Sequence, residues 1–112
     1  MNMSESKQGN ITILQPQGKL NAITSPEMDT HLAGLIEGGT RQIVIDLAGL
    51  DYVSSAGLRV FLSVAKSLQH VAGKLTLASP SPQVQQMLDI AGFGNVLSIY
   101  KTLNEAIAAC TL

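Results

Sequence analysis

The chain has 112 residues, of which 46% are hydrophobic and 13% charged, and seven basic against eight acidic residues give a net charge of −1. This length is typical of one domain with its own core. The absence of a basic patch argues against direct binding of nucleic acid. No apolar run approaches the roughly 18 residues of a membrane span, and the polar first ten residues lack the apolar segment of a signal peptide. We therefore expect a soluble, cytoplasmic protein that does not insert into membranes.

The beginning of the chain predicts a leader followed by two short strands. Residues 1–9 are polar and predict a flexible N-terminal leader, so that the folded domain spans 10–112. Isoleucines then alternate with polar residues up to Pro16 and Gly18, which is typical of a strand that ends in a turn. The segment 19–23 predicts a short second strand, which could pair with the first as a hairpin.

A helix and a buried strand follow. Ser25 before Pro26 predicts an N-cap and a proline at the first helical position, and Gly38 predicts the end of this helix. The β-branched run 43–47 predicts a strand that is buried on both faces, as in a largely parallel sheet.

The next predicted helix begins near Ser55 and stops at Gly73. Its apolar residues recur at helical spacing. We expect this face to pack on the sheet through Leu58, Phe61, Leu62, Ala65, Leu68 and Ala72.

The last part of the chain repeats the alternation of strand and helix. Segment 74–78 predicts a strand, Ser81 begins a helix that ends at Gly92, 96–100 predicts the last strand, and Thr102 begins the last helix. The third helix should contribute to the core through Val84, Met87, Leu88 and Ala91. The order of elements predicts one α/β domain, with a mixed, mostly parallel sheet of about five strands and four helices.

The segment IDLAGLDYVSSAGLRVF places two serines, Ser54 and Ser55, where a strand passes into a helix. A serine at this position is a good N-cap. A hydroxyl there could also accept a phosphate, because the helix N-terminus favours negative charge. Gly57 would let the backbone of a partner approach. The residues alone leave capping and phosphorylation as open alternatives.

The sequence gives little support for catalysis or for metal binding. A nucleophile elbow around Ser55 would need a glycine where Val53 stands, followed by an acid and a histidine in that order. His31 and His70 have the spacing of surface residues on helices, without ligands nearby. Cys110 is alone, so it can form neither an internal disulfide nor a cysteine-based metal site. We expect no catalytic residues, no metal site and no cofactor.

The segment IVIDLAGLDYVSSAGLRVFLSVAK, residues 43–66, resembles the signature of STAS domains, specifically bacterial anti-sigma factor antagonists. The resemblance continues through LDIAGFG to the last helix and covers about residues 11–109. It implies a protein that binds an anti-sigma factor with serine kinase activity, is phosphorylated by it, and is restored by a serine phosphatase. The resemblance implies that the serine two positions before the glycine is the acceptor, which would be Ser55 here, with Ser54 as the alternative.

The resemblance also implies a partner-binding surface formed by Asn21, Ser54, Ser55, Gly57, Leu58 and Arg59. This chain carries Ser54 where the family pattern has an aspartate, and Asn21 where many relatives have an acid. A rival interpretation is a STAS subunit of an ABC-type lipid transporter, or another STAS scaffold. Ser55 favours the regulatory switch, because a scaffold needs no hydroxyl there.

Overall fold

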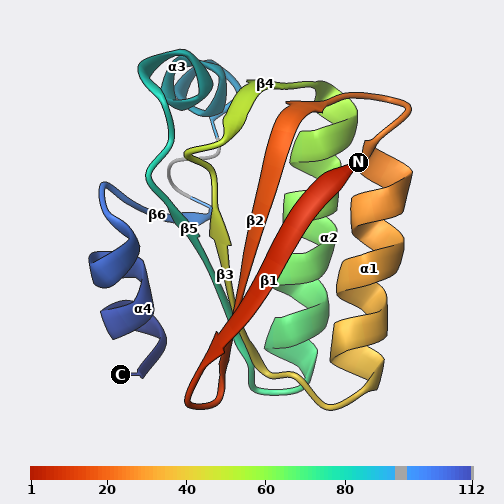
Figure 1. Ribbon diagram of the computed structural model, residues 1–112, viewed down its shortest axis with the longest axis vertical. Coiled ribbons are helices and arrows are strands. Elements are labelled where there is room, and N and C mark those ends of the chain that lie inside the picture. Colours follow the sequence, from red (N-terminus) through yellow and green to blue (C-terminus); the bar gives the residue numbers. More distant parts are fainter. Residues whose placement is uncertain (93–95, 112) are drawn as a thin grey trace.

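The computed structural model describes residues 1–92 and 96–111, which form a six-stranded sheet with helices on both faces (Figure 1). In chain order the elements are β1 (Asn2–Gln8), β2 (Ile11–Leu20), α1 (Ser25–Glu37), β3 (Gln42–Asp46), β4 (Leu50–Val53), α2 (Ser55–His70), β5 (Lys74–Ala78), α3 (Pro82–Ile90), β6 (Ser98–Tyr100) and α4 (Leu103–Thr111). The strand order is β1-β2-β3-β5-β6, and β4 pairs with β2 outside this path. Among the strand pairs of the described residues, β1–β2 alone is antiparallel, which confirms the predicted mixed, mostly parallel sheet.

The predicted flexible leader is wrong, because β1 pairs with β2 along its whole length, from Asn2 opposite Gln17 to Gln8 opposite Ile11. It is an edge strand with mostly exposed side chains, and polar residues are what natural edge strands carry. The polarity that suggested a leader therefore reflects the strand's position in the sheet.

β2 is one strand of ten residues, so the predicted strand, turn and second strand are also corrected. The strand changes partner along its length: it pairs with β3 up to Leu14 and with β4 from Gly18. Pro16 lies between these two pairings, where a missing N–H does not interrupt the parallel ladders. Gly18 has a φ of 94° next to a shift in register, which explains why glycine occupies this irregular point.

The helix starts follow the predicted capping pattern with one correction. The N-cap of α1 is Thr24 and not Ser25, which is buried. Ser81 accepts a hydrogen bond from the Val84 N–H at 3.2 Å, as expected of the cap of α3. Thr102 does the same for α4, where the Glu105 N–H donates to its hydroxyl at 3.1 Å. Helix α2 ends at His70, earlier than predicted.

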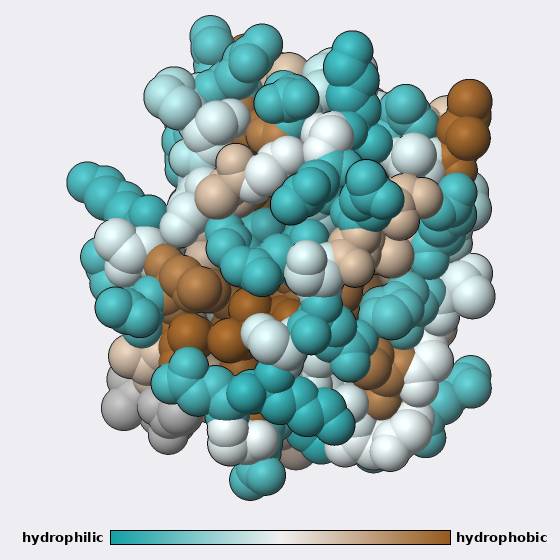
Figure 2. Space-filling model, in the orientation of Figure 1, coloured by the Kyte–Doolittle hydropathy of each residue, from teal (hydrophilic) through white to brown (hydrophobic). Residues whose placement is uncertain are grey.

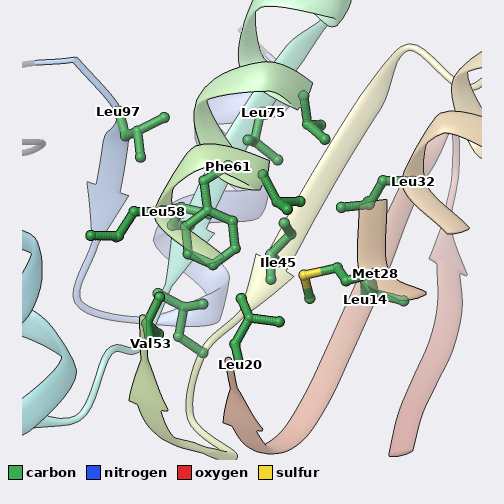
Figure 3. Packing of buried hydrophobic residues seen from close by; sticks show 14 of the residues in the cluster. Leu14, Leu20, Met28, Leu32, Ile45, Val53, Leu58, Phe61, Leu75 and Leu97 are labelled. Carbon is green, nitrogen blue, oxygen red and sulfur yellow. The ribbon is translucent and has the colours of Figure 1, made fainter. Parts of the chain in front are cut away.

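The main core lies between the sheet and the pair of helices α1 and α2, which run side by side in Figure 1. Figure 3 shows the ring of Phe61 pointing from α2 into this core, toward Val53, Leu20 and Ile45.

The predicted face of α2 is confirmed at Leu58, Phe61 and Leu68, whereas Leu62 and Ala65 are half-buried and Ala72 is exposed. Val60 and Val64 are buried as well, so the buried face is wider than predicted. In α3, Val84 and Leu88 are buried, Met87 is half-buried and Ala91 is exposed.

A second cluster lies on the opposite face of the sheet, where α4 packs on β3 and β5. Cys110 belongs to it and is 3% exposed. Among the described residues, no helix is both long and apolar enough to cross a membrane.

Candidate functional site

Ser54 and Ser55 lie between β4 and α2, and the structure gives them different positions. Ser54 is the N-cap of α2: its backbone is extended and its Oγ accepts a hydrogen bond from the Gly57 N–H at 3.4 Å. Its own N–H donates to the Leu20 carbonyl at 2.8 Å. Ser55 is the first residue of the helix and is exposed. Ser54 thus holds the start of the helix, and Ser55 presents its hydroxyl to solvent.

The short strand β4, which the sequence analysis missed, positions this turn. Val53 lies opposite Leu20 at the end of β2, and both side chains are buried. Between the buried ends of β4, Asp51 and Tyr52 are exposed. A four-residue strand with only its end residues buried lacks the alternation that identifies longer strands.

Gly57 packs against the core under the first turn of α2, so the prediction that it makes room for a partner is wrong. It is buried, and a Cβ at this position would lie 2.7 Å from Leu20 Cδ2 and 3.0 Å from Val53 Cγ1. The glycine is required because the first turn of α2 sits directly on these two side chains. Leu58 is likewise in the core, at 7% exposed. Of the predicted partner-binding residues on α2, only Ser55 and Arg59 are exposed.

Asn21 lies in the connection between β2 and α1 and shapes it. Its Oδ1 accepts hydrogen bonds from the N–H groups of Ile23 at 2.9 Å and Thr24 at 3.0 Å, while its own N–H donates to Thr24 Oγ1 at 2.9 Å. Asn21 therefore fixes the loop next to Leu20, to which Ser54 is bonded. The same loop exposes Ile23, at 79%. Figure 2 shows that this side of the molecule is mostly hydrophilic, with hydrophobic side chains gathered left of centre.

Residues that were not predicted from the sequence lie together with Asn21 around a hollow. A hollow of about 430 Å³ is lined by Lys19, Asn21, Asp51, Tyr52 and Gln83. Tyr52 is 41% exposed, and the signal for it in the sequence is an aromatic residue two positions before Ser54. Within the described part of the chain, no cluster of histidine, cysteine or acidic residues could hold a metal ion.

This combination of a mostly parallel α/β sheet and a capped serine turn defines a known class. The STAS domain family matches residues 2–106. BtrV of Bordetella bronchiseptica, a candidate anti-sigma factor antagonist, is 39% identical over 109 residues, which cover 97% of this chain and 91% of BtrV. The chain therefore belongs to the STAS domain family and, within it, to the anti-sigma factor antagonists, which are regulators rather than enzymes.

Solved structures agree on the fold. A candidate anti-sigma factor antagonist from Thermotoga maritima superposes with a TM-score of 0.92 at 22% identity, covering 98% of this chain and 95% of that one. The anti-sigma factor antagonist SpoIIAA in its unphosphorylated form gives a TM-score of 0.82 at 22% identity, covering 95% and 93%. The phosphorylated form of the Bacillus SpoIIAA gives 0.74 at 21% identity, covering 96% and 98%. The predicted STAS fold is thereby confirmed.

Proposed function

We propose that this protein binds an anti-sigma factor that is also a serine kinase, and that phosphorylation of Ser55 by this kinase separates the pair. A serine phosphatase then restores the binding form. The observation that carries the proposal is the exposed Ser55 hydroxyl at the first position of α2, next to a separate N-cap. The names of the relatives support it, because they include an anti-sigma factor antagonist whose structure has a phosphorylated form.

The two serines differ in what a phosphate would disturb. Ser54 is half-buried, and its Oγ already accepts the Gly57 N–H. A phosphate on Ser54 would have to displace that bond at the start of the helix. A phosphate on Ser55 would extend into solvent, beside the N–H groups of Ser55 and Ala56, which precede the first intrahelical hydrogen bond. The fold therefore favours Ser55 as the acceptor.

We define the docking surface as Ser55 and Arg59 of α2 together with Ile23 and Tyr52, which are exposed on the neighbouring loop and strand. Exposed apolar residues beside the acceptor are suited to contact a partner. A phosphate of charge about −1.5 to −2 in the middle of such a surface has to lose its water when the partner docks. A penalty of about 3 kcal/mol would weaken binding more than a hundredfold, since 1.4 kcal/mol is tenfold.

Intact-mass analysis tests the acceptor directly. The protein is purified with its kinase partner, incubated with ATP, and compared with the Ser54→Ala and Ser55→Ala variants. We expect the mass of one phosphate on the wild type and on Ser54→Ala, and none on Ser55→Ala. Transfer that persists in Ser55→Ala and disappears in Ser54→Ala would assign the switch to the other serine. Co-purification of an ABC-type ATPase in place of a kinase would support the transporter scaffold.

A further inference from the structure

The solvent-facing side of α2 carries positive charge and no negative charge. At 3.6 residues per turn, positions 55, 59, 63 and 66 fall within about 80° of one another around the helix axis. All four side chains are exposed. Arg59 and Lys66 thus stand in line with Ser55, and the helix contains no aspartate or glutamate. We call Arg59 and Lys66 the basic stripe.

The charges of the basic stripe are not neutralised within the described part of the chain. The two ion pairs found there join the Met1 amino group to Glu27 and His31 to Glu5, which leaves Arg59 and Lys66 without an acidic partner. The positive end of the α2 dipole lies next to Arg59 and adds to the same field. The neighbouring helix α1 carries exposed Glu27, Asp29 and Glu37, so the positive charge belongs to the outward side of α2 and not to the whole face. Such a region attracts a partner of opposite charge.

We propose that the basic stripe docks against an acidic surface of the anti-sigma kinase, and that a phosphate on Ser55 adds repulsion from this surface to the cost of removing its own water. This inference rests on the proposed function and names the chemistry of the partner's surface. Along the helix axis, Arg59 is about 6 Å from Ser55 and Lys66 about 16 Å, at 1.5 Å per residue. The Debye length at physiological salt is about 8 Å. The phosphate therefore acts on the end of the basic stripe that holds Arg59 and leaves most of the field of Lys66.

The kinetics of association test this charge complementarity. Association of the unphosphorylated protein with the purified kinase is measured by stopped flow at about 25 and 300 mM NaCl, which brackets the range in which surface charges are screened. The test variant is Arg59→Gln/Lys66→Gln. The control is Lys7→Gln/Lys101→Gln, which removes two exposed cations from β1 and from the segment before α4. Both double variants change the net charge from −1 to −3, since each loses two positive charges.

We expect the test variant to associate about tenfold more slowly than wild type at the lower salt concentration, and the two rates to converge at the higher one. The control should stay within about twofold of wild type. The phosphorylated wild type should likewise lose part of its association defect as salt rises.

Equal association rates for the two double variants, or a wild-type rate that salt does not change, would refute the proposal that the basic stripe docks against an acidic surface. The proposed function would survive either result, because the kinase still binds the wild type. If the wild type fails to bind the kinase at both salt concentrations, the proposed function fails, and this inference fails with it.

Discussion

Replacing Gly57 with alanine tests whether the first turn of α2 rests as tightly on β2 and β4 as the structure indicates. The added Cβ would lie 2.7 Å from Leu20 Cδ2, 2.8 Å from Leu20 Cγ and 3.0 Å from Val53 Cγ1. Leu20 is fully buried, so it has little room to move. Overpacking of this kind costs about 1–3 kcal/mol, whereas alanine in place of glycine within a helix gains about 1 kcal/mol. We expect a net loss of about 1 kcal/mol in the free energy of unfolding.

Gly34→Ala is the matched control, because Gly34 also lies in a helix but an added Cβ would meet nothing within 4 Å. This variant should gain about 1 kcal/mol from helix propensity alone. Thermal unfolding followed by circular dichroism should therefore show shifts of opposite sign, each about 4 °C for a chain of this size. If Gly57→Ala is stabilised as much as Gly34→Ala, the close packing under the serine turn is not as the structure describes it.

Three further substitutions probe the core, a buried hydroxyl and the docking surface. Phe61→Ala should lower the free energy of unfolding by about 3–5 kcal/mol, because the ring is fully buried; an unchanged melting temperature would contradict its place in the core. Ser25→Ala should raise the free energy of unfolding by about 1 kcal/mol, because the buried Oγ has no hydrogen-bond partner among the described residues. Chemical denaturation measures this change, and a lower free energy of unfolding in the variant would show that the hydroxyl stabilises the fold. Ile23→Ser should weaken kinase binding about tenfold in a titration, whereas Ile90→Ser, at the same 79% exposure but on α3, should leave binding unchanged; equal effects of the two would remove Ile23 from the docking surface.

Most of the fold could be predicted from the sequence because the central elements are punctuated and strongly patterned. The β-branched run of β3 is buried without interruption, and serine and threonine caps mark the starts of α2, α3 and α4. The edge strand β1 was missed for a physical reason. An edge strand such as β1 needs little apolar sequence, since its partner β2 supplies the hydrogen bonds along one side.

The site was predictable in part. The position of Ser55 could be anticipated from the helix start, and the exposure of Arg59 from helical periodicity. The roles of Gly57 and Asn21 could not, because they depend on segments that are distant in the sequence. Gly57 is required by the Leu20 side chain of β2, and Asn21 shapes the loop that follows Leu20, whose carbonyl accepts the N–H of Ser54.

Leu20 connects these features and explains how a surface modification can act without changing the fold. Its side chain lies under Gly57, and its carbonyl holds the N–H of Ser54. Leu20 and Gly57 are buried, whereas Ser55 is exposed. In the switch that we propose, a phosphate on Ser55 therefore enters neither contact, and the cap remains with Ser54. The phosphate then changes the free energy of binding to the partner and leaves the free energy of unfolding almost unchanged. A single residue could not do both, because the side-chain oxygen that caps the helix would also be the one that carries the phosphate.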